Sequence, residues 1–158
     1  MINSAAEFKE HRYLFDKINN ISKGFYIGIY GLRGIGKTVM LLQLAGSNRN
    51  ALYVPIDATY LANYSIYDIA EEANNRGYSN LFIDEIHTRK GWTAELKTLY
   101  DEKHVHIVFT GSSAANIARG ADLSRRVLMY ELPPTFIEGI SQYKDECGNR
   151  KGKHCNAV

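Results

Sequence analysis

The sequence has little cysteine and no long apolar run, and each absence excludes a class of protein. Its two cysteines, Cys147 and Cys155, both lie in the last dozen residues, so no disulfide framework supports the fold. No apolar run reaches the ~20 residues that a membrane-spanning helix needs, and the N-terminus lacks the basic-then-apolar pattern of a secretory signal. We therefore expect a cytoplasmic protein with no membrane partner.

An excess of charge of one sign is also missing. Lys and Arg number 19 against 17 Asp and Glu, which gives a net charge of +2 and a pI near 8.5. This balance is too weak to argue for nucleic acid or an anionic membrane on its own. The chain has 158 residues, of which 45% are hydrophobic and 23% charged, and these values suit one soluble globular domain.

Short apolar runs alternate with helical patterns along the chain. Strands are predicted at 25–30, 51–56, 81–83, 105–109 and 127–130. Helices are predicted near 5–19, 38–44, 66–73, 92–99 and 114–118. This alternation predicts an α/β fold with right-handed crossovers and a parallel sheet covered on both faces. Pro55 suggests that the second strand lies at an edge of the sheet or ends there.

The stretch YGLRGIGKTVMLLQL (residues 30–44) places three glycines and a lysine between a predicted strand and a predicted helix. Residues 31–38 match the phosphate-loop pattern G-x-x-x-x-G-K-[ST] in full. Glycines let backbone N–H groups approach phosphates, and the helix adds its positive dipole end. Lys37 would reach the β- and γ-phosphates, and the Thr38 hydroxyl would ligate Mg²⁺. The expected nucleotide-binding residues are Gly31, Leu32, Arg33, Gly34, Ile35, Gly36, Lys37, Thr38 and Val39.

An acidic pair follows the third predicted strand in LFIDE (residues 81–85). The strand would deliver Asp84 to the carboxyl end of the sheet beside the phosphate loop, where its carboxylate can hold Mg²⁺. The adjacent Glu85 suits a general base that orients and deprotonates water at the γ-phosphate. An Asp-Glu pair after a strand is often only a solvated helix start, but here a phosphate loop lies some fifty residues upstream.

Hydroxyl and guanidinium groups supply further candidates. Thr110 and Ser112 leave the fourth predicted strand at the same end of the sheet and are expected to sense the γ-phosphate or the attacking water. Ser112 could instead cap the helix that follows. Arg126 precedes the fifth predicted strand, and arginine suits the clamping of developing phosphate charge. Two adjacent arginines near a turn, Arg125 and Arg126, are however more often solvated surface.

With these motifs in hand, the chain resembles the AAA-type P-loop ATPases of bacteria and archaea, specifically the subgroup with a C-terminal DUF4143 or nuclease-like domain. The resemblance runs from about residue 11 to residue 140 and includes the Walker A stretch YGLRGIGKT, the Walker B stretch LFIDEIH, and IVFTGSSA and ADLSRRV. It departs from the family pattern in ELPPTFIEGI, where Ile137 replaces an arginine.

The resemblance implies a three-layer P-loop NTPase of the ASCE or AAA+ type with strand order 5-1-4-3-2. It implies ATP and Mg²⁺ as cofactors, Glu85 as base, and Arg126 as a finger-like arginine that would join copies in a homo-oligomer. Family members usually continue for a couple of hundred residues, so the chain looks like an isolated or truncated core. The expected divisions are an N-terminal helix at 1–23, the ATPase core at 24–146, and a disordered or non-native tail at 147–158.

The sequence therefore predicts a Mg²⁺-dependent ATPase coupled to a partner, such as a DNA or protein client reached through a missing region. A nucleotide-gated switch or scaffold with negligible turnover stays open as the alternative. A P-loop kinase is disfavoured because no arginine-rich substrate lid is visible, and a GTPase because no N-K-x-D follows the fourth or fifth strand.

Overall fold

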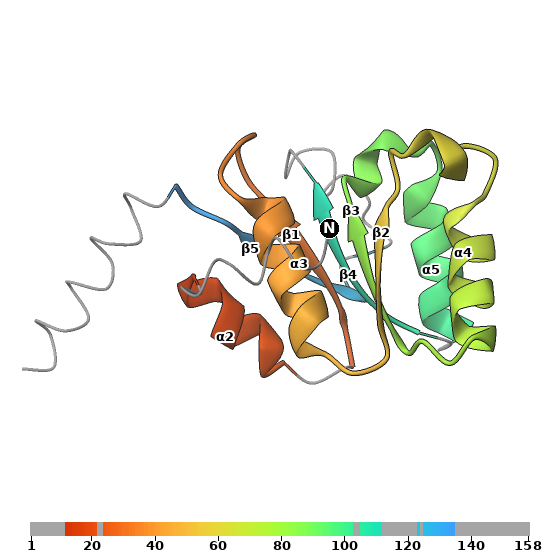
Figure 1. Cartoon of the computed structure of the whole chain (residues 1–158), viewed down its shortest axis with the longest axis horizontal. Helices are drawn as coiled ribbons and strands as arrows, with labels where there is room; N and C mark the ends of the chain where they lie inside the picture. The colour runs from red at the N-terminus through yellow and green to blue at the C-terminus, as the bar shows by residue number, and fades with distance from the viewer. Residues whose placement is uncertain (1–11, 22–23, 103–104, 112–122, 124, 135–158) are drawn as a thin grey trace, which may run out of the picture.

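The fold is a five-stranded parallel sheet between two helical layers (Figure 1). The computed structural model describes residues 12–21, 24–102, 105–111, 123 and 125–134. The strands are β1 (Tyr26–Tyr30), β2 (Ala51–Pro55), β3 (Asn80–Asp84), β4 (His106–Gly111) and β5 (Val127–Glu131). They lie in the order β2-β3-β4-β1-β5, and every neighbouring pair is parallel. The predicted order 5-1-4-3-2, read from the opposite edge, is confirmed.

Helices connect the strands along the chain. The α-helices are α2 (Tyr13–Asn19), α3 (Lys37–Ser47), α4 (Ile66–Asn75) and α5 (Trp92–Glu102). Two short 3₁₀ helices, η1 (Thr59–Leu61) and η2 (Ile86–Thr88), follow β2 and β3. The helix predicted at 5–19 is described only from Tyr13, and the helix predicted near 114–118 lies outside the described residues. None of the described helices has both the length and the apolar character that crossing a membrane requires.

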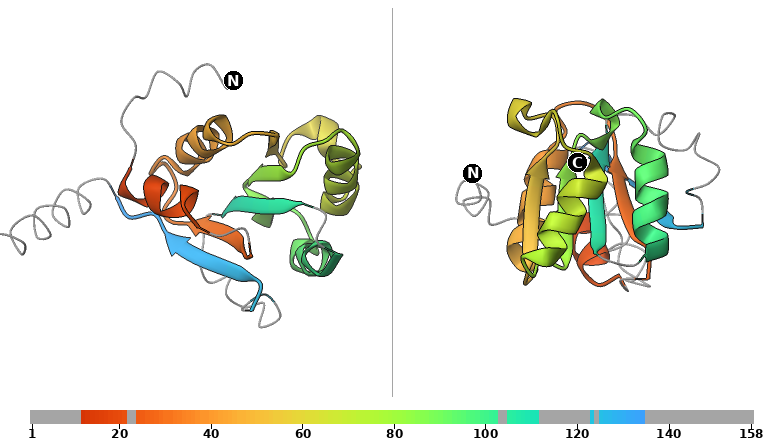
Figure 2. Two further views of the ribbon diagram at one scale, coloured as in Figure 1. Left: turned by 90° about the horizontal axis from the view of Figure 1, so that it is seen from below. Right: turned by 90° about the vertical axis from the view of Figure 1, so that its right-hand side faces the viewer.

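Alternating side chains along each strand pack the two faces of the sheet. On β1, Ile27 and Ile29 join a core with α2 and α3, while Tyr26 joins the opposite core with α4 and α5. On β3, Phe82 faces α3, and its neighbours Leu81 and Ile83 face the other side. Figure 2 shows the resulting three layers from two further directions. Because the central strands β1, β3 and β4 are buried on both faces, they carry the continuous apolar runs that the sequence shows.

Local signals set the ends of two of these elements. Pro55 ends β2, which is an edge strand as expected, since proline offers no N–H to a further neighbour. Ser65 caps α4 in a capping box: its Oγ accepts from the Asp68 N–H at 3.0 Å, and its own N–H donates to Asp68 Oδ2 at 2.9 Å. Gly77, at φ 85°, takes the left-handed conformation just after that helix.

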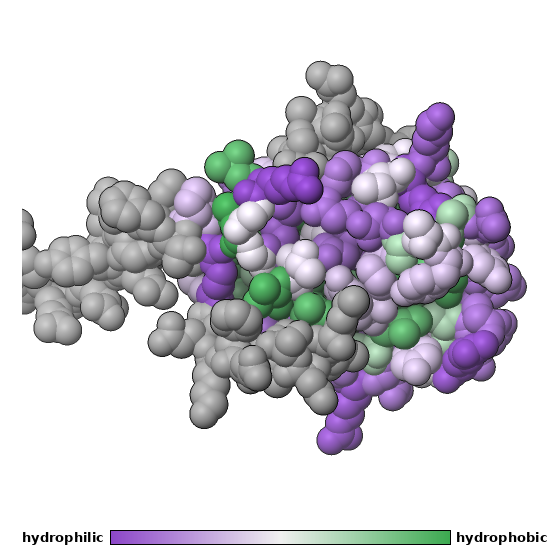
Figure 3. All heavy atoms as spheres, turned by 45° about the horizontal axis from the view of Figure 1, so that its top comes forward, coloured by the Kyte–Doolittle hydropathy of each residue, from purple (hydrophilic) through white to green (hydrophobic). Residues whose placement is uncertain are grey.

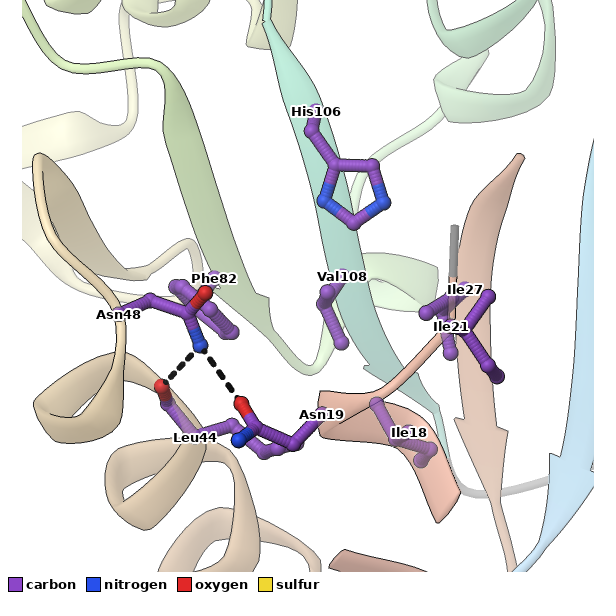
Figure 4. Close-up of a pocket in the computed structure, with 9 residues that line it drawn as sticks. All are labelled: Ile18, Asn19, Ile21, Ile27, Leu44, Asn48, Phe82, His106 and Val108. Carbon is purple, nitrogen blue, oxygen red and sulfur yellow. Dashed lines mark hydrogen bonds between the residues drawn. The ribbon is translucent and has the colours of Figure 1, made fainter. Parts of the chain in front are cut away.

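A pocket lies at the amino end of the sheet, between α2, α3 and the strands (Figure 4). Its side chains are mainly apolar. Asn48 also lines the pocket, and its Nδ2 donates to the Leu44 carbonyl at 2.8 Å and to Asn19 Oδ1 at 3.2 Å. The phosphate loop leaves the opposite, carboxyl end of β1. This pocket is therefore separate from the predicted site.

Candidate functional site

The loop between β1 and α3 contains glycines of two kinds. Gly34 (φ 83°) and Gly36 (φ 92°) are left-handed, and a Cβ built on either meets nothing within 4 Å. A Cβ on Gly31 would instead lie 2.6 Å from the Leu132 carbonyl oxygen, so Gly31 is required by close packing. The loop thus has a packed side anchored at Gly31 and an open side formed by Gly34 and Gly36, where a ligand can approach the backbone.

Lys37 carries its charge into the curve of this loop. Its side chain is only 5% exposed, and Nζ donates to the carbonyls of Gly31 (3.1 Å) and Leu32 (3.0 Å). The first turn of α3 contains no acidic residue, and Thr38 is exposed there. A buried ammonium, a helix N-terminus and an open glycine backbone together form a site for an anion such as a polyphosphate.

Asp84 ends β3 at the same end of the sheet. It is 6% exposed, and both carboxylate oxygens are occupied: Oδ2 accepts from the Tyr53 hydroxyl at 2.9 Å, and Oδ1 accepts from the Thr110 hydroxyl. Burial raises the pKa of Tyr53, and the nearby Asp84 carboxylate raises that pKa further. Tyr53 therefore stays protonated and remains a donor, and Asp84 is held in one orientation.

Glu85 adopts a backbone conformation that is rare outside glycine. Its φ of 53° and ψ of 43° lie in the left-handed region, where a residue with a Cβ costs about 1–2 kcal/mol. The Glu85 N–H donates to Thr110 Oγ1 at 2.9 Å, and Oε2 lies 3.3 Å from His87 Nδ1. The left-handed turn separates the side chains of the two acidic neighbours. As a result, Asp84 is buried while the Glu85 side chain stays partly exposed.

Thr110 differs from its sequence prediction. It was expected to touch the γ-phosphate or the attacking water, but its side chain is 0% exposed and its hydroxyl contacts Asp84 and the Glu85 N–H. A side chain that no solvent molecule reaches cannot touch a ligand in this conformation. Thr110 instead contacts the two acidic residues. Ser112, its predicted companion, lies outside the described residues.

Arg126 lies at the opposite end of the sheet from the phosphate loop. Its carbonyl accepts from the Tyr26 N–H at 2.9 Å, and its guanidinium binds Asp101 through Nε (2.9 Å) and Nη2 (3.0 Å). β5 starts one residue later and runs beside β1 up to Tyr30, about 13 Å farther along the strand. The structure does not bring Arg126 to the phosphate loop of its own chain.

Comparison with known proteins agrees with this fold. The AAA_14 family model, described as an AAA domain, matches residues 23–139. The chain belongs to this family of AAA domains.

Relatives of this AAA domain are longer proteins. It is 34% identical over 137 residues to the uncharacterized protein MJ1637 of Methanocaldococcus jannaschii, and the match covers 78% of this chain but only 29% of that protein. Among solved structures it is similar to AMPPCP-bound DnaA from Aquifex aeolicus, with a TM-score of 0.50 and 15% identity over 90% of this chain and 51% of DnaA.

A second structural likeness is to Drosophila ORC bound to AT-rich DNA and Cdc6, with a TM-score of 0.50 and 15% identity. That match covers 95% of this chain and 66% of the solved chain. At such low identity these likenesses show the fold alone, and the fold is that of the three-layer P-loop NTPases. The family match is to an AAA domain and does not include the C-terminal DUF4143 part that the resemblance implies.

Sequence reasoning missed two residues that hold this site of the AAA domain. Tyr53, the donor to Asp84, carried no signal because only the pairing of β2 with β3 brings it there. Arg12 was not singled out for any contact, yet Nη1 donates to the Ile35 carbonyl of the phosphate loop at 2.6 Å and Nη2 donates to the Pro133 carbonyl. Arg12 thus joins the loop to the chain that follows β5.

The residues present fit a nucleotide-bound magnesium ion better than a protein-only metal centre. Among the described residues, no three His, Cys, Asp or Glu side chains gather as a metal-binding group. Mg²⁺ typically takes one or two protein ligands and completes its shell with water and substrate phosphates, and Thr38 and Asp84 carry oxygen atoms of this kind at the same end of the sheet. Figure 3 views the carboxyl end obliquely: hydrophilic side chains predominate, and the apolar patches between them are small.

Proposed function

We propose that this AAA domain binds ATP together with Mg²⁺ and hydrolyses it, and that the nucleotide state acts on a partner or on a further part of a longer protein. One observation carries the proposal. The buried Lys37 ammonium lies under a loop whose Gly34 and Gly36 are left-handed and open, at the sheet end where Asp84 and Glu85 emerge.

The loop would bind the phosphates through its backbone. N–H groups from Gly31 to Val39 and the N-terminus of α3 provide donors that need no rearrangement of side chains. Lys37 is bonded to carbonyls rather than to a carboxylate, so it can exchange those two bonds for phosphate oxygens without breaking an ion pair. A triphosphate is the ligand whose charge best suits this arrangement.

The acidic residues would divide the chemistry. A bound Mg²⁺, held by Thr38 and Asp84, would neutralise charge on the transferred phosphoryl group. Glu85, turned away from Asp84 by its left-handed backbone, would accept the proton of a water and orient that water toward the γ-phosphate. Arg126 does not reach the loop of its own chain, so we propose it as a donor to a neighbouring copy in a homo-oligomer.

Two substitutions test this assignment separately. Glu85→Gln should lower kcat for ATP by about 10²–10⁴-fold while ATP binding survives, because only the base is lost. Lys37→Ala should weaken ATP binding about 10–150-fold, because a charge-assisted contact disappears. Phosphate release and calorimetry measure the two effects, each with and without Mg²⁺.

Matched surface variants control for nonspecific effects. Glu72→Gln removes an exposed carboxylate on α4, and Lys17→Ala removes an exposed ammonium on α2; both should leave turnover and affinity unchanged. Unchanged turnover in Glu85→Gln would remove Glu85 from the mechanism. Unchanged affinity in Lys37→Ala would leave the loop without a phosphate-binding role.

A nucleotide-gated switch with negligible turnover is the second candidate. Glu85 Oε2 lies 3.3 Å from His87 Nδ1, and Arg126 is bound to Asp101 far from the loop. Single-turnover measurement on the isolated chain separates the two candidates. Retention of intact ATP for hours supports the switch, and release of phosphate within minutes supports the ATPase.

The partner and the base preference form the finer part of the proposal. ORC, whose solved structure contains AT-rich DNA, shares only the fold, so DNA is one client class to test and protein is the other. DNA binding would show a steep fall in affinity with salt. Equilibrium binding of ATP against GTP tests the adenine preference that the family implies.

A further inference from the structure

The Thr110 hydroxyl is shared between the two acidic residues of the proposed ATPase site. It donates to Asp84 Oδ1 and accepts from the Glu85 N–H at 2.9 Å. Thr110 comes from β4, which lies between β1, the strand that leads into the phosphate loop, and β3, the strand that carries the acids. A single buried side chain thus connects the strand next to the loop with both acidic groups.

The same hydroxyl ends β3. The pairing of β3 with β4 runs from Asn80–His106 to Ile83–Phe109. Beyond it, on the β2 side, the Asp84 carbonyl still accepts from the Ile56 N–H at 3.4 Å. On the β4 side the Glu85 N–H bonds to the Thr110 side chain and not to a backbone carbonyl. The chain then turns into the left-handed conformation at Glu85 and enters η2.

We propose that Thr110 is a positioning residue for Glu85: its hydroxyl fixes the left-handed turn that separates the Glu85 carboxylate from the buried Asp84. This inference rests on the proposed ATPase function for its catalytic consequence, but its structural part stands apart from that function. The hydroxyl offsets the cost of a left-handed backbone at a residue with a Cβ by satisfying its N–H. Without it, Glu85 would lose the orientation in which it can serve as a base.

Two substitutions separate the hydroxyl from the buried methyl group of Thr110. Thr110→Val keeps the shape and loses the hydroxyl, whereas Thr110→Ser keeps the hydroxyl and loses the methyl. A residue that serves only to pack the core would tolerate Val better than Ser. A positioning hydroxyl predicts the opposite order.

The first measurement needs neither nucleotide nor activity. Amide hydrogen exchange of Glu85 in the full chain should be about 5–10-fold faster in Thr110→Val than in the wild type, because the acceptor of its N–H is gone. Thr110→Ser should keep the wild-type rate. Equal Glu85 protection in Thr110→Val and the wild type would overturn the inference. If Thr110→Val does not fold, Thr110→Ala serves as the variant without a hydroxyl.

The second measurement uses ATP turnover. Thr110→Val should lower kcat by about 10²-fold, the effect of misplacing a catalytic group by about 1 Å, and leave KM for ATP within about 2-fold. Thr110→Ser should restore kcat. In a Glu85→Gln background Thr110→Val should add no further loss, since it acts through Glu85. Additive losses in the double variant, or loss of turnover in Ser but not in Val, would overturn the positioning role.

The two measurements distinguish failure of this inference from failure of the proposed function. A wild-type chain that releases no phosphate would refute the ATPase proposal, while the exchange rates of Glu85 would still decide whether Thr110 holds the turn. Normal exchange behaviour in Thr110→Val together with wild-type turnover would instead leave the ATPase intact and remove Thr110 from it.

Discussion

The two ends of the sheet hold their polar side chains in different ways. At the carboxyl end, Lys37, Asp84 and Thr110 are buried; Lys37 donates to carbonyls of the phosphate loop, and Thr110 donates to Asp84. At the amino end, the Tyr100 hydroxyl donates to the Gly24 carbonyl at 2.7 Å, and His106 lies 3.0 Å from the Phe25 carbonyl. The first group surrounds an open loop, whereas the second ties side chains to the chain entering β1.

This difference suggests that the polar groups at the carboxyl end serve binding, whereas those at the amino end stabilise the fold. Burying a charge costs free energy that hydrogen bonds recover only in part, so a fold selected for stability alone has little reason to place Lys37 and Asp84 in its interior. The carboxyl end also contains the left-handed Gly34, Gly36 and Glu85. Buried charge beside an open glycine loop, at the carboxyl end of a parallel sheet, is typical of a binding site.

The two ends of α3 offer the sharpest way to break this comparison. Gly36 starts the helix at φ 92°, so Gly36→Ala should destabilise the fold by about 1–2 kcal/mol and obstruct the open side of the loop. Gly46, near the last turn, is exposed and helical, with nothing within 4 Å of a built Cβ. Gly46→Ala should stabilise by about 0.5–1 kcal/mol. Denaturant unfolding and ATP binding measure both variants.

Opposite signs for the two alanine variants would support the division between the ends. If Gly36→Ala stabilised the fold and kept ATP affinity, the left-handed start of α3 would not be a requirement of the site. A loss of ATP affinity in Gly46→Ala would show that a residue at the amino end of the sheet also affects nucleotide binding at the phosphate loop.

Backbone features of the site were predictable from the sequence, and side-chain partnerships were not. The phosphate loop and the LFIDE strand carry local patterns, and alternating strands and helices limit the sheet to few topologies. Tyr53 and Arg12 reach the site only through pairing of distant segments, for which a single sequence holds no signal. Thr110 was predicted as a site residue, but the sequence predicted a direct contact with the γ-phosphate or the attacking water. Its position at the end of a strand does not reveal that its side chain is buried.

Two tyrosines sharpen the comparison at the level of single hydroxyls. The Tyr53 hydroxyl donates to Asp84 at 2.9 Å, so Tyr53→Phe should cost about 1–2 kcal/mol of unfolding free energy. The Tyr26 hydroxyl is buried with no hydrogen-bond partner among the described residues. Tyr26→Phe should therefore change stability by less than about 0.5 kcal/mol. Equal losses in the two variants would contradict the distinction.

The same tyrosines predict a pH dependence. Burial raises the pKa of Tyr26, with Tyr100 and Asp101 adding to the rise, and burial with Asp84 raises the pKa of Tyr53, both from the ordinary value of 10.0. Their contribution to stability is full below pH 10 and is lost as the pH rises above it, since the unfolded chain releases these protons first. Stability measured from pH 8 to pH 11 should fall less steeply in either Phe variant.

The smallest expected effect concerns Arg126, which tests whether the amino end serves anything besides stability. Its guanidinium binds Asp101, and this contact lowers the pKa of that carboxyl. The Asp101 contribution is present above its unfolded pKa and is lost as the pH falls through the lowered value. Because the pair is solvent-exposed, Arg126→Gln should reduce stability only slightly at neutral pH and remove this acid dependence. Turnover at low protein concentration should stay unchanged, since Arg126 does not reach its own loop. A loss of turnover that appears only at concentrations where copies associate would instead mark Arg126 as a residue supplied to a neighbouring site.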